Sequence, residues 1–366
     1  MSTYRINIVL FGIRTIGSAL IREVIKNQQS LLENKNIDLR FPIIANSNLA
    51  FFEKEDQKNN WEADVNQLTI PYTMSYIIER AKEQGHENLI AIDATRGPEF
   101  AKSYISLIQN GFDIVSVNNI VNSLHHDYYT EVRRNLKKYN TEFLYESHIS
   151  PGLAIADTIK DLQASGDIVT KVRAVASSSL SYIFSRYGNE AIPFSKILED
   201  AEKLGYTNSD SREDLSGVDV ARKLLIIARE LDQKVELKDI KVQSLLTESI
   251  SKSTSKVIYN TQKKILDRVF KIAKQNQKEK HVLRYIGEID LEHNTFEVKL
   301  VSEPIDSNIG QLKAGEHLIE LYTLNNGTTP ITIQGAAFGK QNTAKSILSD
   351  ILKIAERKKQ PYIASF

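Results

Sequence analysis

The chain has 366 residues, of which 41% are hydrophobic and 25% charged, with a net charge of +1 and no cysteine. This composition is ordinary for a globular protein of two domains, and the small net charge gives no sign of nucleic-acid or anionic-membrane binding. The absence of cysteine excludes disulfides and thiolate chemistry, and the histidines show no metal-ligand spacing. No segment resembles a signal peptide or reaches the ~20 apolar residues of a membrane span, so we expect a cytoplasmic protein.

The first half of the chain alternates between strand and helix patterns. We expect strands at residues 6–11, 39–45, 89–94, 113–117 and 142–145, and helices at 16–26, 72–84, 98–109 and 128–139. Such alternation favours a parallel sheet that is covered by helices on both faces.

The second half has a different pattern. We expect helices at residues 152–163, 194–204, 215–231 and 255–277, then strands at 282–289, 296–301, 317–324 and 331–335, and a last helix at 343–356. The successive strands indicate antiparallel pairing. The change of pattern places a domain boundary near Pro151-Gly152.

A glycine-rich turn, Gly12-Ile13-Arg14-Thr15-Ile16-Gly17, follows the first expected strand and opens the first expected helix. Its place and length are typical of a dinucleotide-binding G-x-G-x-x-G turn. Arg14, however, stands where the middle glycine lets the backbone approach a pyrophosphate. The turn therefore predicts a Rossmann-like domain with an altered nucleotide site.

The most distinctive stretch is a carboxylate-rich loop at residues 205–223 that continues into a helix. Asp219 and Lys223 are four residues apart, so they share a helix face. From spacing alone we favour a structural interpretation, with a capped helix start at Ser216 and an ordinary helix ion pair. The alternative is a polar strip that faces a binding cleft, because the rest of this helix is apolar.

This stretch closely resembles the substrate-binding segment of the homoserine dehydrogenase family, G-[YF]-T-E-x-D-P-x-x-D-L-x-G-x-D-x-A-R-K. Ser179–Phe184 resembles the family's S-L-S-Y-I-F, and shorter matches lie at residues 45–47, 93–95, 143–146 and 282–285. The resemblance covers nearly the whole chain. It implies an α/β protein with a Rossmann-like parallel-sheet domain at residues 1–150, completed by 335–366. It also implies an α+β substrate-binding and dimerisation domain at 151–334, and hence a homodimer.

The family reduces aspartate 4-semialdehyde to homoserine with a nicotinamide cofactor. By resemblance, Lys223 and Asp219 are catalytic, and the substrate would contact Asp214, Asn208, Tyr206, Thr207 and Ser179. The cofactor would contact the glycine-rich turn and the ends of two later strands, at Gly12, Arg14, Ile16, Gly17, Thr95, Arg96, Asn118 and Asn119.

The chain departs from the family pattern at several of these turns. Asn208 replaces a glutamate, Asn119 a lysine, Arg14 and Ser178 glycines, and Phe338 a small residue. Glycine is used where a backbone must approach a ligand, so added side chains are expected to fill the cofactor's volume.

We therefore expect a degenerate cofactor site, no bound cofactor and the loss of nicotinamide-dependent hydride transfer. A cleft for a small amino-acid-like or aldehyde molecule would serve non-redox chemistry or the binding of a ligand or partner. The alternative is an active homoserine dehydrogenase that uses NAD or NADP.

Two features leave alternatives open. Arg14 and Arg96 either bind an anion or plug the vacant pocket and pair with acids such as Asp93. The lysine-rich helix around Ile258, Ile265, Val269 and Ile272 either meets an anionic partner or carries solvated lysines over a core stripe. We favour the core stripe, because the whole chain is nearly neutral.

Overall fold

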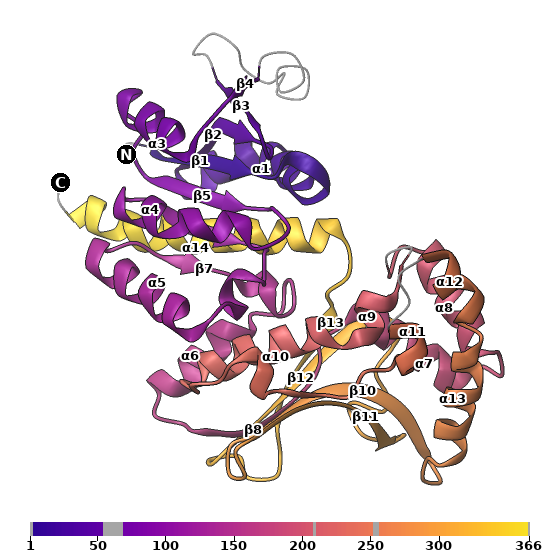
Figure 1. Ribbon diagram of the computed structural model, residues 1–366. Helices are drawn as coiled ribbons and strands as arrows, with labels where there is room; N and C mark the ends of the chain where they lie inside the picture. Colours follow the sequence, from indigo (N-terminus) through magenta and orange to yellow (C-terminus); the bar gives the residue numbers. More distant parts are fainter. Residues whose placement is uncertain (1–2, 54–68, 208–209, 252–255, 365–366) are drawn as a thin grey trace. The chain divides into compact units, whose positions relative to one another are not determined.

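The computed structural model describes residues 3–53, 69–207, 210–251 and 256–364. The chain divides into two compact units (Figure 1). Unit 1 comprises Met1–Gly152 with Gly339–Phe366, and unit 2 comprises Leu153–Phe338. Among the described residues, no helix is both long enough and apolar enough to span a lipid bilayer.

Unit 1 contains a seven-stranded sheet of order β4-β3-β2-β1-β5-β6-β7. Its strands are β1 (Tyr4–Phe11), β2 (Ile37–Ala45), β3 (Leu49–Phe52), β4 (Ile70–Pro71), β5 (Leu89–Asp93), β6 (Asp113–Ser116) and β7 (Phe143–Leu144). Five neighbouring strands pair in parallel, as the strand–helix alternation predicted, in the order β2-β1-β5-β6-β7. The antiparallel strands β3 and β4 were not predicted, because segments this short carry no periodicity.

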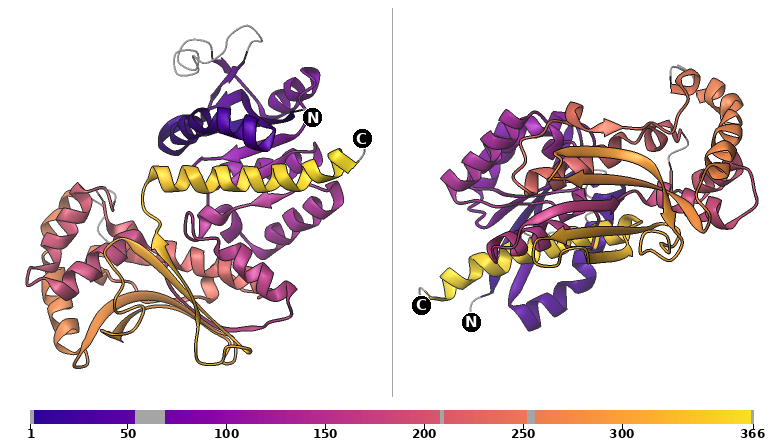
Figure 2. Two further views of the ribbon diagram at one scale, coloured as in Figure 1. Left: turned by 180° about the vertical axis from the view of Figure 1, so that it is seen from behind. Right: turned by 90° about the horizontal axis from the view of Figure 1, so that it is seen from below.

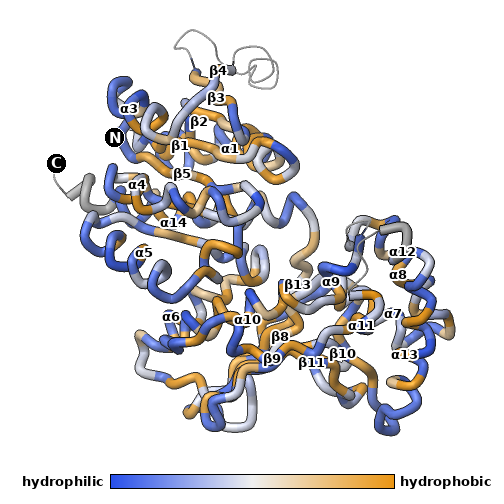
Figure 3. Tube along the Cα trace, in the orientation of Figure 1, coloured by the Kyte–Doolittle hydropathy of each residue, from blue (hydrophilic) through white to orange (hydrophobic). Residues whose placement is uncertain are grey.

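Helices cover both faces of this sheet. They are α1 (Ser18–Lys35), α3 (Met74–Glu83), α4 (Tyr104–Gln109), α5 (His126–Tyr139) and α14 (Lys340–Ala364). Ile8 and Leu10 of β1 pack with α1 and α14, whereas Val9 and Phe11 pack with α3 and α4. Figure 2 shows α1 and α14 side by side on the face away from α4, and Figure 3 shows the apolar residues along β1 and β5. These two cores fix the turn that follows β1.

Unit 2 contains a six-stranded sheet of order β13-β12-β8-β10-β11-β9. Its strands are β8 (Val169–Val175), β9 (Lys241–Val242), β10 (His281–Asp290), β11 (Thr295–Pro304), β12 (Glu316–Thr323) and β13 (Ile331–Ala336). Apart from the short parallel contact between β9 and β11, the strands pair antiparallel, which confirms the expected pairing. The prediction omitted β8.

The helices of unit 2 are α6 (Ile155–Ala164), α7 (Ser178–Asn189), α8 (Phe194–Lys203), α9 (Arg212–Ser216), α10 (Val218–Glu230), α11 (Glu248–Ser251), α12 (Lys256–Gln262) and α13 (Ile265–Gln275). Helices α7 and α10 contact β10. The single helix predicted for residues 255–277 is wrong, because the chain breaks at Lys263-Lys264 between α12 and α13. Helix α7 was also missed, although Ser177 caps it by accepting a hydrogen bond from the amide of Leu180.

Candidate active site

The glycine-rich turn lies at the carboxyl end of β1 in unit 1. Gly12 has φ +97°, and a Cβ there would lie 2.5 Å from the carbonyl oxygen of Ala94, so only glycine fits. A Cβ on Gly17 would lie 2.2 Å from the carbonyl oxygen of Gly12. Gly12 is therefore needed for the close packing of the turn beside the end of β5, and Gly17 for the close approach of the turn to its own first residue. The turn leads directly into α1. The amino end of a helix at this place suits a phosphate.

Asp93 organises the neighbouring strand ends. Its fully buried carboxylate accepts hydrogen bonds from the amide and hydroxyl of Thr95, at 2.9 and 2.6 Å, and from the hydroxyl of Tyr104, at 2.9 Å. Burial raises the pKa of Asp93, and these hydrogen bonds oppose the rise. Asn118, at the end of β6, donates to the carbonyl of Gly97 at 2.8 Å. Thr95 and Asn118 are thus brought together, while Asn119 beside them is half-buried.

Arg14 and Arg96 do not pair with Asp93. Both residues are exposed, and Ile16 next to them is half-buried. In the described part of the chain neither guanidinium has an ion pair, and Asp93 is bound by other groups. The expected pairing of these arginines with Asp93 is therefore wrong. The anion-binding alternative stays a prediction.

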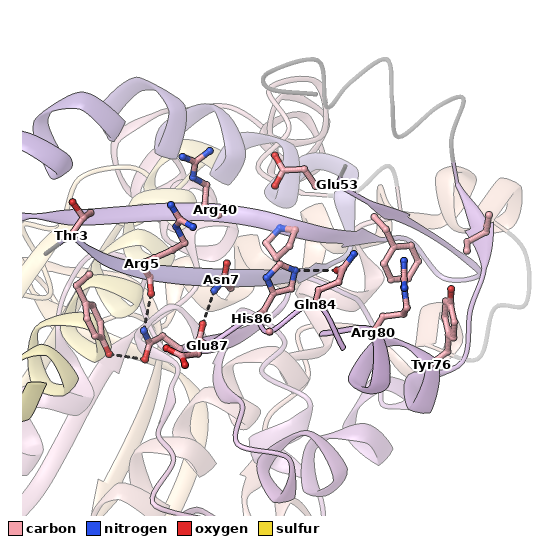
Figure 4. A pocket seen from close by; sticks show the side chains of 16 residues that line it. Thr3, Arg5, Asn7, Arg40, Glu53, Tyr76, Arg80, Gln84, His86 and Glu87 are labelled. Carbon is pink, nitrogen blue, oxygen red and sulfur yellow. Dashed lines mark hydrogen bonds between the residues drawn. The ribbon is translucent and has the colours of Figure 1, made fainter. Parts of the chain in front are cut away.

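A separate cavity of about 1060 Å³ lies near the amino ends of β1 and β5 (Figure 4). Arg5, Arg40 and His86 line it together with Glu53 and Glu87. None of the residues that we predicted for the site lines this cavity. It is therefore remote, along the strands, from the glycine-rich turn.

Lys223 in unit 2 is held by two oxygen atoms. Its Nζ donates to the carbonyl of Ala176 at 2.7 Å and lies 2.9 Å from Oδ2 of Asp219 on the same face of α10. The Lys223 side chain is 13% exposed, whereas the Asp219 side chain is 40% exposed. The predicted ion pair is confirmed, and the ammonium group lies at the end of β8 rather than in open solvent.

Asp214 lies on α9, just before the turn into α10. Gly217 forms this turn with φ +77°, and a Cβ there would lie 2.0 Å from the hydroxyl oxygen of Tyr285. Ser179 donates to Oδ1 of Asp214 at 2.8 Å, whereas buried Oδ2 has no hydrogen-bond partner among the residues that the structure describes. Burial is the main cause that raises the pKa of Asp214 to about 6, with the nearby Asp219 adding to it. The unpaired oxygen is a suitable acceptor for a ligand's ammonium group.

Tyr206 is fixed by aromatic stacking. Its ring packs on Tyr182 at 4.3 Å and on Phe338 at 4.2 Å between centroids. Phe338 therefore orders Tyr206 within unit 2. The adjacent Thr207 is buried, and within the described ranges its hydroxyl has no hydrogen-bond partner. Asn208, which we also expected to bind substrate, lies outside the described residues.

One residue near Lys223 was not predicted. His317 of β12 is buried, and its Nε2 lies 2.8 Å from the hydroxyl oxygen of Ser178. Burial lowers the pKa of His317 to about 3, and the charge of Lys223 contributes. No spacing could have revealed this pair, because its members are 139 residues apart in the chain.

Two family models match the chain. The model described as "Homoserine dehydrogenase" matches residues 155–352, and the model described as "Homoserine dehydrogenase, NAD binding domain" matches residues 12–146. Together they cover both units.

Named relatives agree with these models. A homoserine dehydrogenase of Paracoccidioides brasiliensis is 31% identical over 277 residues, which cover 73% of this chain and 74% of that protein. A bifunctional aspartokinase/homoserine dehydrogenase of Buchnera aphidicola is 33% identical over 353 residues, which cover 95% of this chain and 42% of that protein. The chain thus spans about two fifths of the length of its bifunctional relatives.

A solved structure shares the fold. A hyperthermophilic archaeal homoserine dehydrogenase in complex with NADPH superimposes with a TM-score of 0.73 at 17% identity, over 96% of this chain and 98% of that one. This likeness supports the Rossmann-like parallel-sheet domain with a second α+β domain.

These findings contradict the expectation that nicotinamide-dependent hydride transfer has been lost. The nucleotide-binding model matches the residues that we took to be degraded, beginning at Gly12. The expectations of a degenerate site and of no cofactor have no support either. The error was to infer the loss of the cofactor from replaced residues at several turns, because the two family models match the chain across these positions.

Proposed function

Because the chain belongs to the homoserine dehydrogenase family, we propose that it is an active NAD- or NADP-dependent homoserine dehydrogenase that reduces aspartate 4-semialdehyde to homoserine. The observation that carries the proposal is the position of Lys223. Its ammonium group is largely buried beside Asp219 and belongs to the same group of charges as Asp214. A positioned cation and a carboxylate are the two charges that this substrate requires.

The residues of the glycine-rich turn fit a dinucleotide. A Cβ at Gly12 or Gly17 would collide with backbone, so the turn keeps the tight geometry that a pyrophosphate uses at the amino end of α1. Arg14 and Arg96 are exposed beside this turn, where their guanidinium groups are available to a phosphate. A bound dinucleotide of this kind supplies the hydride.

The side chains of unit 2 would bind the substrate and move the proton. The free Oδ2 of Asp214 accepts the substrate's ammonium group, and the hydroxyl of Thr207 is available to a polar group of the same molecule. Reduction adds a hydride to the aldehyde carbon and a proton to its oxygen. Lys223 donates that proton, while Asp219 holds the lysine in place.

Replacing Lys223 tests the assignment. We expect the wild-type protein to oxidise NADPH in the presence of aspartate 4-semialdehyde and Lys223→Met to lose roughly 10²–10⁴-fold in kcat, the usual contribution of a positioned general acid. Exposed Lys238 gives the matched control, since Lys238→Met removes a cation from the same unit without touching the cluster. A wild-type protein that binds neither cofactor nor aldehyde would refute the proposal.

The cofactor site is tested separately at Arg14. Fluorescence titration with NADPH is expected to show weaker binding for Arg14→Gln, by about tenfold, the effect of one charge-assisted hydrogen bond. Arg22→Gln removes another exposed arginine from α1 and serves as the control. Tighter binding by Arg14→Gln would instead mean that the arginine obstructs the cofactor.

We further propose that the protein acts as a homodimer on a small amino-acid-like substrate, without nucleic-acid or membrane partners. Equilibrium sedimentation checks the dimer, and a monomer at assay concentration would refute it.

A further inference from the structure

Ser178 and His317 form a polar contact beside the Lys223 cluster. Ser178 is the first residue of α7, His317 lies on β12, and their Oγ and Nε2 atoms are 2.8 Å apart. Ser178 occupies a position at which the family pattern has glycine. The hydroxyl group of Ser178 therefore distinguishes this chain from the family pattern. It contacts the buried imidazole of His317, which no sequence pattern predicted there.

The imidazole of His317 is neutral at physiological pH. Burial is the largest cause that lowers its pKa to about 3, and the charge of Lys223 lowers it further, against an opposing effect of Asp219. A neutral ring has one N–H donor and one acceptor nitrogen, so it can orient a hydroxyl group but cannot store a proton for the reaction.

Ser178 is the accessible member of three consecutive serines. Ser177 and Ser179 are buried and mutually bonded at 2.9 Å, with Ser177 capping α7 and Ser179 donating to Asp214. Ser178 is only half-buried, and its neighbours contact the cluster directly: Ser179 donates to Asp214, and the carbonyl of Ala176 accepts from Lys223. The amino end of α7 also favours negative charge at this place.

We propose that Ser178 is a further catalytic residue of the reduction, with its hydroxyl donating a hydrogen bond to the aldehyde oxygen as negative charge develops there. His317 is the positioning residue: its Nε2–H donates to Oγ of Ser178 and thereby turns the hydroxyl proton toward the substrate. The inference rests on the proposed function.

The chemical balance requires no additional reactant. The hydride adds to the carbonyl carbon, the ammonium group of Lys223 gives the proton that completes the alcohol, and Ser178 keeps its own proton.

Four variants test this arrangement kinetically. Ser178→Ala and Ser178→Gly remove the hydroxyl, and each is expected to lower kcat roughly 10²-fold, the cost of one lost oxyanion donor, with KM nearly unchanged. His317→Leu is expected to match them, whereas His317→Gln keeps an N–H donor and restores most of the rate. The double variant Ser178→Ala/His317→Leu should be no slower than either single variant, because both act through one hydroxyl.

Controls separate catalysis from folding. Ser165→Ala removes an exposed serine of unit 2 and should leave kcat unchanged. Thermal unfolding and NADPH titration of each variant show whether it folds and binds cofactor; the Ser178 variants suffice if His317→Leu fails to fold. A Ser178→Ala protein with the wild-type kcat would overturn the inference and leave the proposed function intact, whereas an inactive wild-type protein would overturn both.

The tautomer of His317 gives a test that is independent of turnover. In ¹⁵N-labelled protein, the ring nitrogens of His317, assigned by comparison with His317→Gln, are expected to report a proton on Nε2 at neutral pH. A proton on Nδ1 would overturn the inference, because Ser178 would then donate to the ring and not to the substrate.

Discussion

At the scale of single residues, Asp214 combines a cost in folding stability with a proposed role in substrate binding. Its carboxylate is satisfied on one oxygen by Ser179 and unsatisfied on the other. Because the pKa of Asp214 is about 6 and the ordinary value is 3.8, ionisation of this carboxyl lowers the free energy of unfolding. The charged form is nevertheless the one that would attract the ammonium group of the proposed substrate.

Asp214→Asn is therefore expected to change stability and binding in opposite directions. The folded pKa is raised, so the cost of ionisation is absent below pH 4, grows between pH 4 and 6, and is complete above pH 6. The variant should gain stability over the wild type across this window, by on the order of 2–3 kcal/mol from a shift of about two pKa units. Urea unfolding measured at pH 4 and pH 7 checks the gain, and an equal difference at both values would contradict it.

The same residue predicts the acidic limb of the activity profile. In the wild type kcat/KM should rise with pH through about 6, as Asp214 ionises and becomes able to hold the ammonium group. In Asp214→Asn this limb should disappear together with most of the substrate affinity. A retained limb would assign it to another group.

The sequence was informative about residues that are close in the chain and uninformative about distant ones. The pair Asp219–Lys223 follows from helix geometry alone. The contact of Asp214 with Ser179 joins residues 35 positions apart, and that of Ser178 with His317 joins residues 139 apart. The exposure of the Arg14 side chain depends on backbone angles that no residue pattern encodes.

At the scale of elements, α13 turns a different face to the core from the one predicted. Leu266 and Phe270 are buried, with Phe270 stacked on Phe194 at 3.8 Å between ring centroids. The residues expected in the core, Ile265, Val269 and Ile272, are 45%, 37% and 48% exposed. The break at Lys263-Lys264 explains the error, because it resets the phase of an apolar pattern that was read as continuous.

Substitutions on the two faces of α13 should thus differ sharply in cost. Leu266→Ala is expected to lower the free energy of unfolding by roughly 2–5 kcal/mol, as for other fully buried leucines. Val269→Gln should change the free energy of unfolding by no more than about 0.5 kcal/mol, because the Val269 side chain is exposed. Chemical denaturation of both variants tests the assignment, which fails if Val269→Gln is as costly as Leu266→Ala.

At the scale of the whole molecule, unit 1 depends on a distant segment for one of its layers. Helix α14 contributes buried Ile347, Ile351 and Ile354 to the core beneath β1 and α1. The strand–helix alternation of the first half predicted the parallel sheet. It could not show that this face needs α14, because that information lies in residues some 200 positions further along the chain.

A charged residue in the buried face of α14 should therefore abolish cofactor binding, although α14 is remote in sequence from the glycine-rich turn. Ile351 is fully buried, so Ile351→Asp places an unpaired carboxylate in the core and is expected to unfold unit 1 or lower its melting temperature strongly. Exposed Lys345 provides the control, and Lys345→Asp should bind NADPH as the wild type does. Normal NADPH binding by Ile351→Asp would show that α14 is dispensable.

The pairing of α1 with α14 also has a consequence for biosynthesis. Lys359 donates to the carbonyl of Lys35 at 2.6 Å, which joins residues 324 positions apart. On the ribosome, one apolar face of the amino-terminal sheet is covered by α1 alone until the 186 residues of unit 2 and then α14 have been translated. That interval is when chaperones would be recruited, and synonymous codons that slow elongation before α14 would lengthen it.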